Sequence, residues 1–340
     1  MTTADGSILG TTKIVDNGPS SARWDLVIMG DGYRSGQMSQ YETDVQEFVD
    51  HLFGTPPFDE LRPAINVHRV NVTSTDSGAD DPTACGGSGA TARTYFDASF
   101  CNSNIRRLLL VNNATALATA DEKVPQWNAV LVVVNSTVYG GAGGAVGTFS
   151  RATGAEEIAL HELGHTAFGL ADEYEYFRGC GVDTDRNNHP ASEPAEVNVT
   201  TNTDRATLKW RRFVAASTRL PTTKNADCTR CDPQASPVAA GTVGLFEGAH
   251  YYHCGAFRPE FDCKMRNLGD PFCAVCSERI RRVLAPYLRA RPPLEQGVYT
   301  VQQRSNGRFV DAHEVSVRDF AVVTRTAQNN DTQRWVIKPL

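Results

Sequence analysis

Long apolar runs are missing from this 340-residue chain: no stretch approaches the 18 apolar residues that a membrane-spanning helix needs. Residues 1–6, Met-Thr-Thr-Ala-Asp-Gly, also lack the charged-then-apolar pattern of a signal peptide. An excess of positive charge is missing too, since the net charge is −6, which predicts no broad attraction to nucleic acid or anionic membranes. What remains is the composition of a globular protein, with 41% hydrophobic and 21% charged residues.

Cysteine, by contrast, is abundant. Nine cysteines are many for a cytosolic enzyme, and segment 187–240 is rich in Asn, Thr, Pro and Ala. Together they predict a secreted protein whose leader is absent from this chain; cytosolic residence is the alternative. The odd count leaves at least one cysteine without an intrachain partner. Disulfides are the favoured use of the others, and proximity suggests Cys85–Cys101 and Cys254–Cys263. The competing use is a structural zinc site formed by two C-x-x-C pairs, Cys228/Cys231 and Cys273/Cys276.

Hydrophobic periodicity predicts an α/β fold. Strand patterns and helix patterns alternate along the first half of the chain: strand 24–29, helix 38–52, strand 64–73, helix 103–119 and strand 129–134. This order favours a twisted, mainly parallel sheet with right-handed crossovers. Apolar residues at helical spacing over 280–288 predict a final helix.

The same patterns suggest domain boundaries. Residues 1–291 are expected to form one domain, with an α/β subdomain over about 20–170 and an irregular C-terminal subdomain over 171–291. Pro-rich residues 292–296 look like a linker, and residues 297–340 change to the alternating pattern of a short all-β tail.

The most informative motif is H-E-x-x-H at residues 161–165. On a helix, His161 and His165 are four residues apart and lie on one face, where two imidazoles can hold one Zn²⁺. Glu162 stands beside them, placed to take a proton from a metal-activated water. A site of this kind hydrolyses peptide bonds. The sequence therefore predicts a zinc endopeptidase with Glu162 as general base.

A third ligand must return to the metal, and a continuous helix does not supply it. Asp172 would lie about 10 Å along the axis from His165 if the helix continued. Gly169 is expected to break the helix, because glycine readily adopts the left-handed conformation that ends helices. After this break, Asp172 can fold back toward the metal. Glu173 is the second candidate, and a residue far downstream is the third.

The run His-Glu-Leu-Gly-His-Thr-Ala-Phe-Gly-Leu-Ala-Asp-Glu-Tyr over 161–174 resembles the signature of the IgA-peptidase family of zinc metallopeptidases, a metzincin-like group. The resemblance covers roughly residues 20–290. Its further segments are 24–33 (WDLVIMGDGY), 74–80 (STDSGAD), 134–141 (VNSTVYGG), 244–249 (GLFEGA) and 262–266 (DCKMR).

This resemblance implies a metzincin-like fold with a set of site residues. The implied zinc ligands are His161, His165 and Asp172, with Glu162 catalytic and Met265 in a methionine turn under the metal. One departure concerns the spacing, because the better-known metzincin pattern H-E-x-x-H-x-x-G-x-x-H/D places its glycine and third ligand one residue earlier. The ligand loop is therefore different here, and Glu173 remains a candidate for the third zinc ligand.

Three further patterns suggest roles around the site. Tyr252 is a candidate to stabilise the oxyanion, with Tyr251 as the alternative and core packing as the other use of this aromatic run. Asp76, Asp80 and Asp81 sit in a Ser-Gly-rich turn, where clustered carboxylates suit Ca²⁺, although such turns commonly bind nothing. The Gly-rich segment 139–148 is interpreted as a loop leading into an edge strand, to which an extended substrate can add.

The tail and the function leave alternatives open. Residues 297–340 resemble one repeat of a ricin-type β-trefoil lectin, closing on Gln333-Arg-Trp335, although that fold needs three repeats. The expected partner is a protein or peptide substrate, including a glycoprotein. Two other functions compete with an endopeptidase: an inactive protease body that serves as a carbohydrate- or protein-binding module, and a zinc amidase acting on cell-wall peptides. The complete His161, Glu162 and His165 set argues against an inactive body.

Overall fold

The computed structural model separates into two compact units, Met1–Arg289 and Ala290–Leu340. The residues it describes are 5–181, 183, 185–232, 234–288, 297–302, 308–312, 322–327, 333 and 335–337. The segment expected to be a linker, 292–296, lies outside the described residues.

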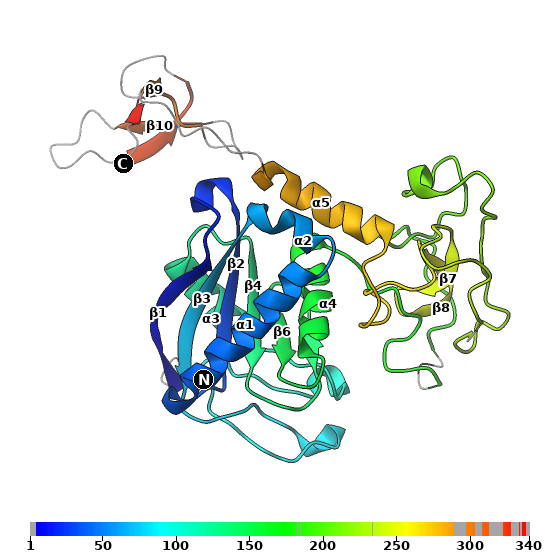
Figure 1. The fold of residues 1–340 in the computed structure, drawn as a ribbon, viewed down its shortest axis with the longest axis horizontal. Helices are drawn as coiled ribbons and strands as arrows, with labels where there is room; N and C mark the ends of the chain where they lie inside the picture. The colour runs from blue at the N-terminus through cyan, green and yellow to red at the C-terminus, as the bar shows by residue number, and fades with distance from the viewer. Residues whose placement is uncertain are drawn as a thin grey trace. The chain divides into compact units, whose positions relative to one another are not determined.

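A six-stranded sheet forms the centre of the first unit, in the order β1-β3-β2-β4-β6-β5 (Figure 1). Its strands are β1 (Gly6–Val15), β2 (Trp24–Asp31), β3 (Ile65–Ser74), β4 (Ala129–Val134), β5 (Gly141–Ala142) and β6 (Gly147–Ser150). β2 pairs in parallel with β3 and β4, and β4 in parallel with β6. β1 and β5 are antiparallel edge strands. The predicted mixed α/β fold with a mainly parallel sheet is therefore correct, whereas β1 was not predicted.

Five α-helices accompany the sheet: α1 (Met38–Gly54), α2 (Phe58–Leu61), α3 (Asn113–Lys123), α4 (Ala155–Phe168) and α5 (Ala274–Leu288). The helix expected over 103–119 is wrong at its start. α3 begins only at Asn113, because the side chain of Asn112 accepts a hydrogen bond from Thr115 N at 3.1 Å and so caps the first turn. The residues before it contain a 3₁₀ turn at Asn102–Asn104 instead.

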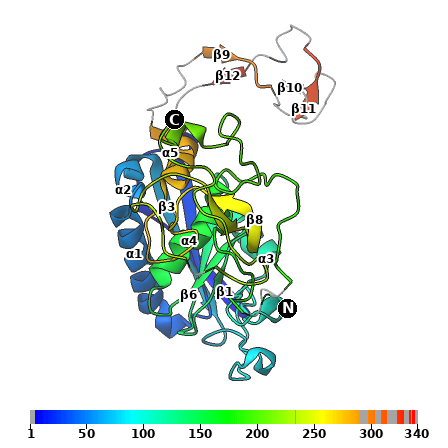
Figure 2. The ribbon, with the colours of Figure 1, turned by 90° about the vertical axis from the view of Figure 1, so that its right-hand side faces the viewer.

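The helices cover both faces of the sheet, as Figure 2 shows for α1 and α3. Alternate residues of β2 divide between the two cores because successive strand side chains point to opposite faces. Leu26 and Ile28 join the core with α1, α4 and α5. Val27 and Met29 join the core with α3. α4 is therefore anchored against the sheet by a buried apolar face, and this anchoring fixes the helix that carries the H-E-x-x-H motif.

The second half of this unit contains long irregular segments and one hairpin, formed by β7 (Phe246–Ala249) and β8 (Tyr252–Arg258). Disulfides connect the irregular segments. The predicted Cys85–Cys101 bond is present. The other two bonds are Cys180–Cys231 and Cys228–Cys254.

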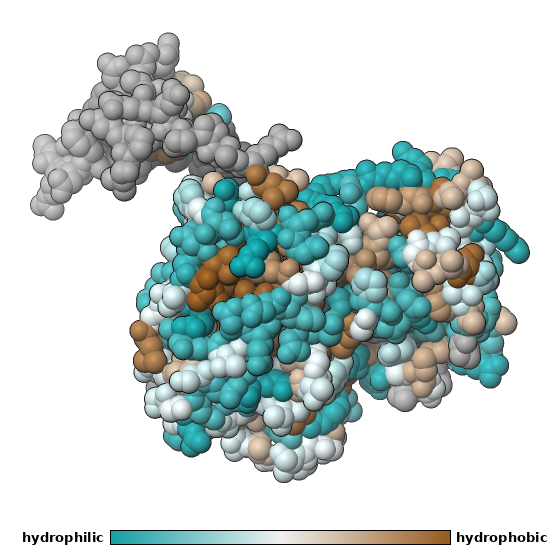
Figure 3. All heavy atoms as spheres, in the orientation of Figure 1, coloured by the Kyte–Doolittle hydropathy of each residue, from teal (hydrophilic) through white to brown (hydrophobic). Residues whose placement is uncertain are grey.

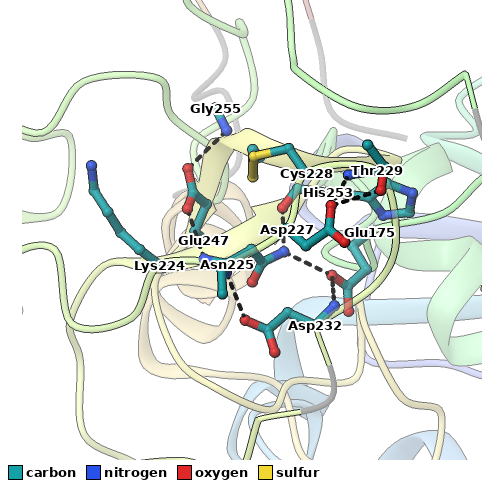
Figure 4. Close-up of a disulfide and its surroundings, with 12 residues drawn as sticks. Glu175, Lys224, Asn225, Asp227, Cys228, Thr229, Asp232, Glu247, His253 and Gly255 are labelled. Atoms are coloured by element: carbon teal, nitrogen blue, oxygen red, sulfur yellow. Dashed lines mark hydrogen bonds between the residues drawn. A yellow bond between two sulfur atoms is a disulfide. The ribbon is translucent and has the colours of Figure 1, made fainter.

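These bonds correct two predictions. Cys254 pairs with Cys228 rather than with Cys263, so the expected Cys254–Cys263 disulfide is wrong. The prediction of a zinc site made from both C-x-x-C pairs is also wrong, because Cys228 and Cys231 form disulfides with Cys254 and Cys180. Figure 4 shows the surroundings of Cys228, where Asn225 donates to Glu175 and to the carbonyl of His253 and so ties the loop to β8.

Hydrophilic side chains cover most of the face of the first unit seen in Figure 3, with smaller hydrophobic areas between them. Within the described ranges, no helix combines the length and the apolar character needed to cross a bilayer.

The described residues of the second unit include four short strands, β9 (Gly297–Tyr299), β10 (Phe309–Ala312), β11 (Val322–Arg325) and β12 (Trp335–Ile337). They form two antiparallel pairs, β9 with β12 and β10 with β11. Gln333 is buried and donates to the carbonyl of Thr326 at 3.0 Å. The resemblance to a lectin repeat stays a prediction.

Candidate active site

Helix α4 presents the two motif histidines on one face and ends where the sequence predicts. Gly169 adopts the left-handed conformation, with φ 60° and ψ 42°, and its N–H bonds to the carbonyl of His165 at 3.1 Å. Glycine carries no Cβ, so this conformation is accessible without a steric penalty. The chain then reverses direction, and Leu170 and Asp172 return alongside the helix they have just left.

This return brings three predicted ligands together. Asp172 Oδ1 lies 2.9 Å from His161 Nε2 and 3.2 Å from His165 Nε2, and the two Nε2 atoms lie 3.2 Å apart. His161 and Asp172 are buried, and His165 is half-buried. Glu173, the second candidate for the third ligand, is not in this group and joins a different cluster.

The spacing fits a zinc ion. Tetrahedral ligands at about 2.0–2.1 Å from Zn²⁺ stand roughly 3.3 Å from one another, close to the three distances found here. The other ring nitrogens are engaged as well: His161 Nδ1 donates to the carbonyl of Lys264 at 2.9 Å, and His165 Nδ1 to that of Leu170 at 2.7 Å. These bonds fix each ring and turn the Nε2 lone pairs toward Asp172, which is how proteins orient histidine ligands.

The charges of the trio are strongly coupled. Burial opposes ionisation of Asp172, but His165 and His161 lower its pKa well below the ordinary value. Burial likewise disfavours the charged form of His165, yet Asp172 raises its pKa to about 9. Burial also raises the pKa of Glu162, although both histidines act against the rise. The site is a compact donor set in which negative charge is concentrated on Asp172.

Two cavities of about 340 Å³ and 580 Å³ border the trio. They share five lining residues: Arg107, Gly141, His161, Glu162 and Tyr174. The smaller cavity also contacts His165, Asp172 and Tyr251. The larger one extends toward Tyr139 and Arg266. Glu162 thus lines both cavities.

The two candidate tyrosines differ in position. Tyr251 lines the smaller cavity, and its hydroxyl donates to Asp172 Oδ2 at 2.5 Å. The hydroxyl of Tyr252 instead accepts from Arg186 Nη1 at 3.0 Å, and its ring packs against His189. Neither cavity bordering the trio is lined by Tyr252.

A strained turn holds Tyr251 in place. His250 and Tyr251 join β7 to β8 with φ of 56° and 71°, a left-handed conformation that costs non-glycine residues roughly 1–2 kcal/mol each. The turn is held by the ligand segment, because His250 N donates to the carbonyl of Asp172 at 3.1 Å and Tyr251 N to that of Tyr174 at 3.0 Å. Strain of this kind persists where the surroundings determine the conformation.

The Gly-rich segment leads into β6, which pairs with β4 and β5 and is not an edge strand; the edge strand β5 lies inside the segment, beside α4. A Cβ on Gly143 would meet His165 Cβ at 2.5 Å, so glycine permits this close approach. The outer side of β5 is not free at Gly141, however. Its N–H donates to the carbonyl of Arg107 and its carbonyl accepts from Leu109 N. Addition of a substrate strand at Gly141 is therefore blocked.

The aspartates considered for calcium have other partners. Asp76 pairs with Arg93 at 2.9 Å and Asp81 with Arg106 at 2.8 Å. Asp80 accepts a hydrogen bond from Ala92 N. Within the part of the chain that the structure describes, these carboxylates do not form a metal-binding group, so calcium receives no support here.

Sequence reasoning missed Arg107 and Tyr174, which line both cavities. Tyr174 follows the ligand segment directly and belongs to the 161–174 run, so proximity to Asp172 was a usable signal. Arg107 comes from an irregular segment, and its guanidinium reaches the carbonyl of Phe177 at 3.4 Å. Nothing in the local pattern around Arg107 indicates this long-range contact.

Comparison with known families agrees with this geometry. The family model described as IgA Peptidase M64 matches residues 12–234 and 233–284. The chain therefore belongs to the IgA peptidase M64 family, whose members are metallopeptidases. Membership supports a peptidase, a hydrolase whose substrate is a protein or peptide. A search of curated proteins returned no match.

Proposed function

We propose that the chain is a zinc-dependent endopeptidase in which His161, His165 and Asp172 hold the metal and Glu162 is the general base. The observation that carries this proposal is the convergence of two oriented imidazoles and one carboxylate within 2.9–3.2 Å, beside a glutamate that borders both cavities. Nitrogen and carboxylate oxygen donors in tetrahedral spacing suit Zn²⁺.

A zinc ion held by this trio would supply Lewis acidity toward the peptide carbonyl and the attacking water. Glu162 accepts the proton of the attacking water and passes it to the amine that leaves when the peptide C–N bond breaks. The Tyr251 hydroxyl is the group that donates to the carbonyl oxygen as it gains negative charge. We assign this role to Tyr251 rather than Tyr252, since only the former borders the cavity.

Glu162 lines two cavities, which gives a substrate room on more than one part of the site and favours cleavage inside a chain over removal of a terminal residue. Arg107 adds a positive charge to both cavities, suited to a carbonyl or an acidic side chain of the substrate. Three disulfides are compatible with an extracellular location, and we propose that the protein is secreted.

Glu162→Gln tests the mechanism. The amide keeps the shape of the side chain but does not accept the proton, so turnover is expected to fall by about 10²–10⁴-fold while the zinc content stays unchanged. Activity is measured on a peptide library by mass spectrometry, with a chelator control. Wild-type turnover by the variant would disprove the assignment of Glu162 as base. Neighbouring Glu156→Gln, on the first turn of the same helix, is the matched control.

A further inference from the structure

We propose that the protein holds a second metal ion, a structural Zn²⁺ bound by Glu173, Cys263, Cys273 and Cys276. The proposal goes beyond the peptidase function. All four side chains are buried, and one ligand atom from each lies within 4.8 Å of all the others. The three cysteines take no part in the disulfides of the chain.

The distances suit a shared cation. Cys263 Sγ and Cys276 Sγ are 3.8 Å apart, far beyond the about 2.05 Å of a disulfide. Two sulfurs bound tetrahedrally to Zn²⁺ at about 2.3 Å are roughly 3.8 Å apart. Glu173 Oε1 lies 3.3 Å from Cys276 Sγ and 4.0 Å from Cys273 Sγ, which completes a compact donor set.

The Glu173 carboxylate points to a ligand independently of the cysteines. Its side chain has 0% exposure. Asn198 Nδ2 donates to Oε1 at 2.9 Å, whereas Oε2 has no hydrogen-bond partner among the described residues. A buried charge without a partner is costly. The nearby cation, Arg258, acts on this carboxylate electrostatically, but its guanidinium donates its hydrogen bonds to the carbonyls of Glu247, Gly248 and Phe261.

Backbone N–H groups point at two of the sulfurs. Cys273 and Cys276 form a C-x-x-C pair at the start of α5, where the helix dipole stabilises negative charge. Cys273 N donates to Cys263 Sγ at 3.3 Å, and Cys276 N donates to Cys273 Sγ at 3.4 Å. Three soft sulfurs and one carboxylate select zinc over magnesium or calcium. Four protein ligands leave no open position, which is typical of a structural site.

The position of this cluster gives it a role. Two of its members, Glu173 and Cys263, lie on the segments that complete the candidate active site, and the other two lie at the start of α5. Glu173 N donates to the carbonyl of Met265 at 2.8 Å, and Lys264, between Cys263 and Met265, supplies the carbonyl that orients His161. An ion held by Glu173 and the cysteines therefore fastens these segments to the start of α5.

Metal counting on the full chain tests the proposal. Protein produced with zinc is expected to carry two zinc ions per chain by elemental analysis. His161→Ala/His165→Ala should carry one, and Cys273→Ser/Cys276→Ser should lose the other ion. The control Cys85→Ser/Cys101→Ser removes a distant disulfide and should keep both. A wild-type count of one, retained in the Cys273→Ser/Cys276→Ser variant, would overturn the proposal.

A second measurement needs no cysteine variant, in case that variant does not fold. His161→Ala/His165→Ala, stripped of metal and loaded with Cd²⁺, should show the ultraviolet absorption of cadmium bound to thiolates, because only the cysteine cluster remains. Absence of this band, or recovery of a Cys263–Cys276 disulfide by peptide mapping, would refute the cluster as a metal site. Inactivity of the enzyme on peptides leaves this test unaffected, so the two proposals fail independently.

Discussion

Asp172 and Glu173 are consecutive residues, yet their carboxylates belong to different clusters. Asp172 Oδ1 lies 2.9 Å from His161 Nε2, whereas Glu173 Oε1 lies 3.3 Å from Cys276 Sγ. Both side chains are buried. The backbone between them is fixed from two directions, because His250 N donates to the carbonyl of Asp172 and Glu173 N donates to the carbonyl of Met265. These two backbone hydrogen bonds hold the segment so that Asp172 faces the histidines and Glu173 faces the cysteines.

The first prediction follows from this division. Asp172→Ala should weaken zinc binding at the histidines by more than about 100-fold, since loss of an outer-shell partner alone costs about 10–100-fold. Glu173→Ala should weaken that affinity much less, because Glu173 does not contact the histidines and acts on them only through the cysteine cluster. Competition with a chromophoric chelator measures both. Loss of the histidine-bound metal from Glu173→Ala, with retention in Asp172→Ala, would reverse the assignment.

The second prediction separates the two tyrosines. Tyr251→Phe removes the hydroxyl that borders the cavity, and loss of one such donor typically lowers kcat about 10²–10³-fold. Tyr252→Phe should change kcat by less than about 3-fold, because that hydroxyl contacts Arg186 instead. Steady-state kinetics on one cleaved peptide compares them. Equal losses in both variants would contradict a specific role for Tyr251.

The third prediction concerns the helix end. Gly169→Ala places a Cβ in a left-handed conformation, which costs roughly 1–2 kcal/mol, and no atom closer than 3.9 Å crowds that Cβ. Urea unfolding should show this loss. Gly269→Ala is the matched control, since its Cβ meets nothing within 4 Å and its φ is not positive. An unchanged free energy of unfolding in Gly169→Ala would show that the turn tolerates a side chain.

The fourth prediction is a pH dependence of stability from Glu193, away from both clusters. Partial burial raises its pKa, but hydrogen bonds from Thr200, Lys209 and Thr201 lower it from 4.5 to about 2. Between these values the unfolded chain binds more protons, so stability rises with pH. The contribution is complete above pH 4.5 and is lost as pH falls toward 2.

Glu193→Gln should therefore flatten the rise of the unfolding free energy between pH 2 and 4.5. Urea titrations at a series of pH values measure the slope. Glu122→Gln, which replaces an exposed glutamate paired only with its neighbour Lys123, should keep the wild-type slope. An identical slope in Glu193→Gln would mean that this carboxylate does not contribute.

Elements with an uninterrupted pattern were predictable. β4 coincides with the predicted range 129–134, because a continuous β-branched run is typical of a strand buried on both faces. β1 was missed since its pairing with β3 is interrupted by two irregularities, at Ile8/Gly10 and Lys13/Val15, and its residues are all half-buried or exposed. Irregular pairing breaks the alternation of apolar and polar residues by which an edge strand is recognised in a sequence.

The site was predictable where local geometry determines it. Two histidines four residues apart on a helix, and a glycine that ends that helix, require little beyond chain geometry to bring Asp172 back. Arg107 and the Cys228–Cys254 bond depend instead on contacts between distant segments, which local sequence does not encode. For the same reason, the sequence kept Glu173 as an alternative third ligand. Its contacts with Cys273 and Cys276 join segments far apart in the chain.

The two clusters use neighbouring residues of the same segments, 172–173 and 263–265. This arrangement implies that metal binding at one cluster affects metal binding at the other. If an ion at the cysteines favours the arrangement in which Lys264 orients His161, it increases the affinity of the histidine site. Linkage is reciprocal, so an ion at the histidines then increases the affinity of the cysteine cluster by the same factor. Loading of the two sites is then cooperative although they share no ligand.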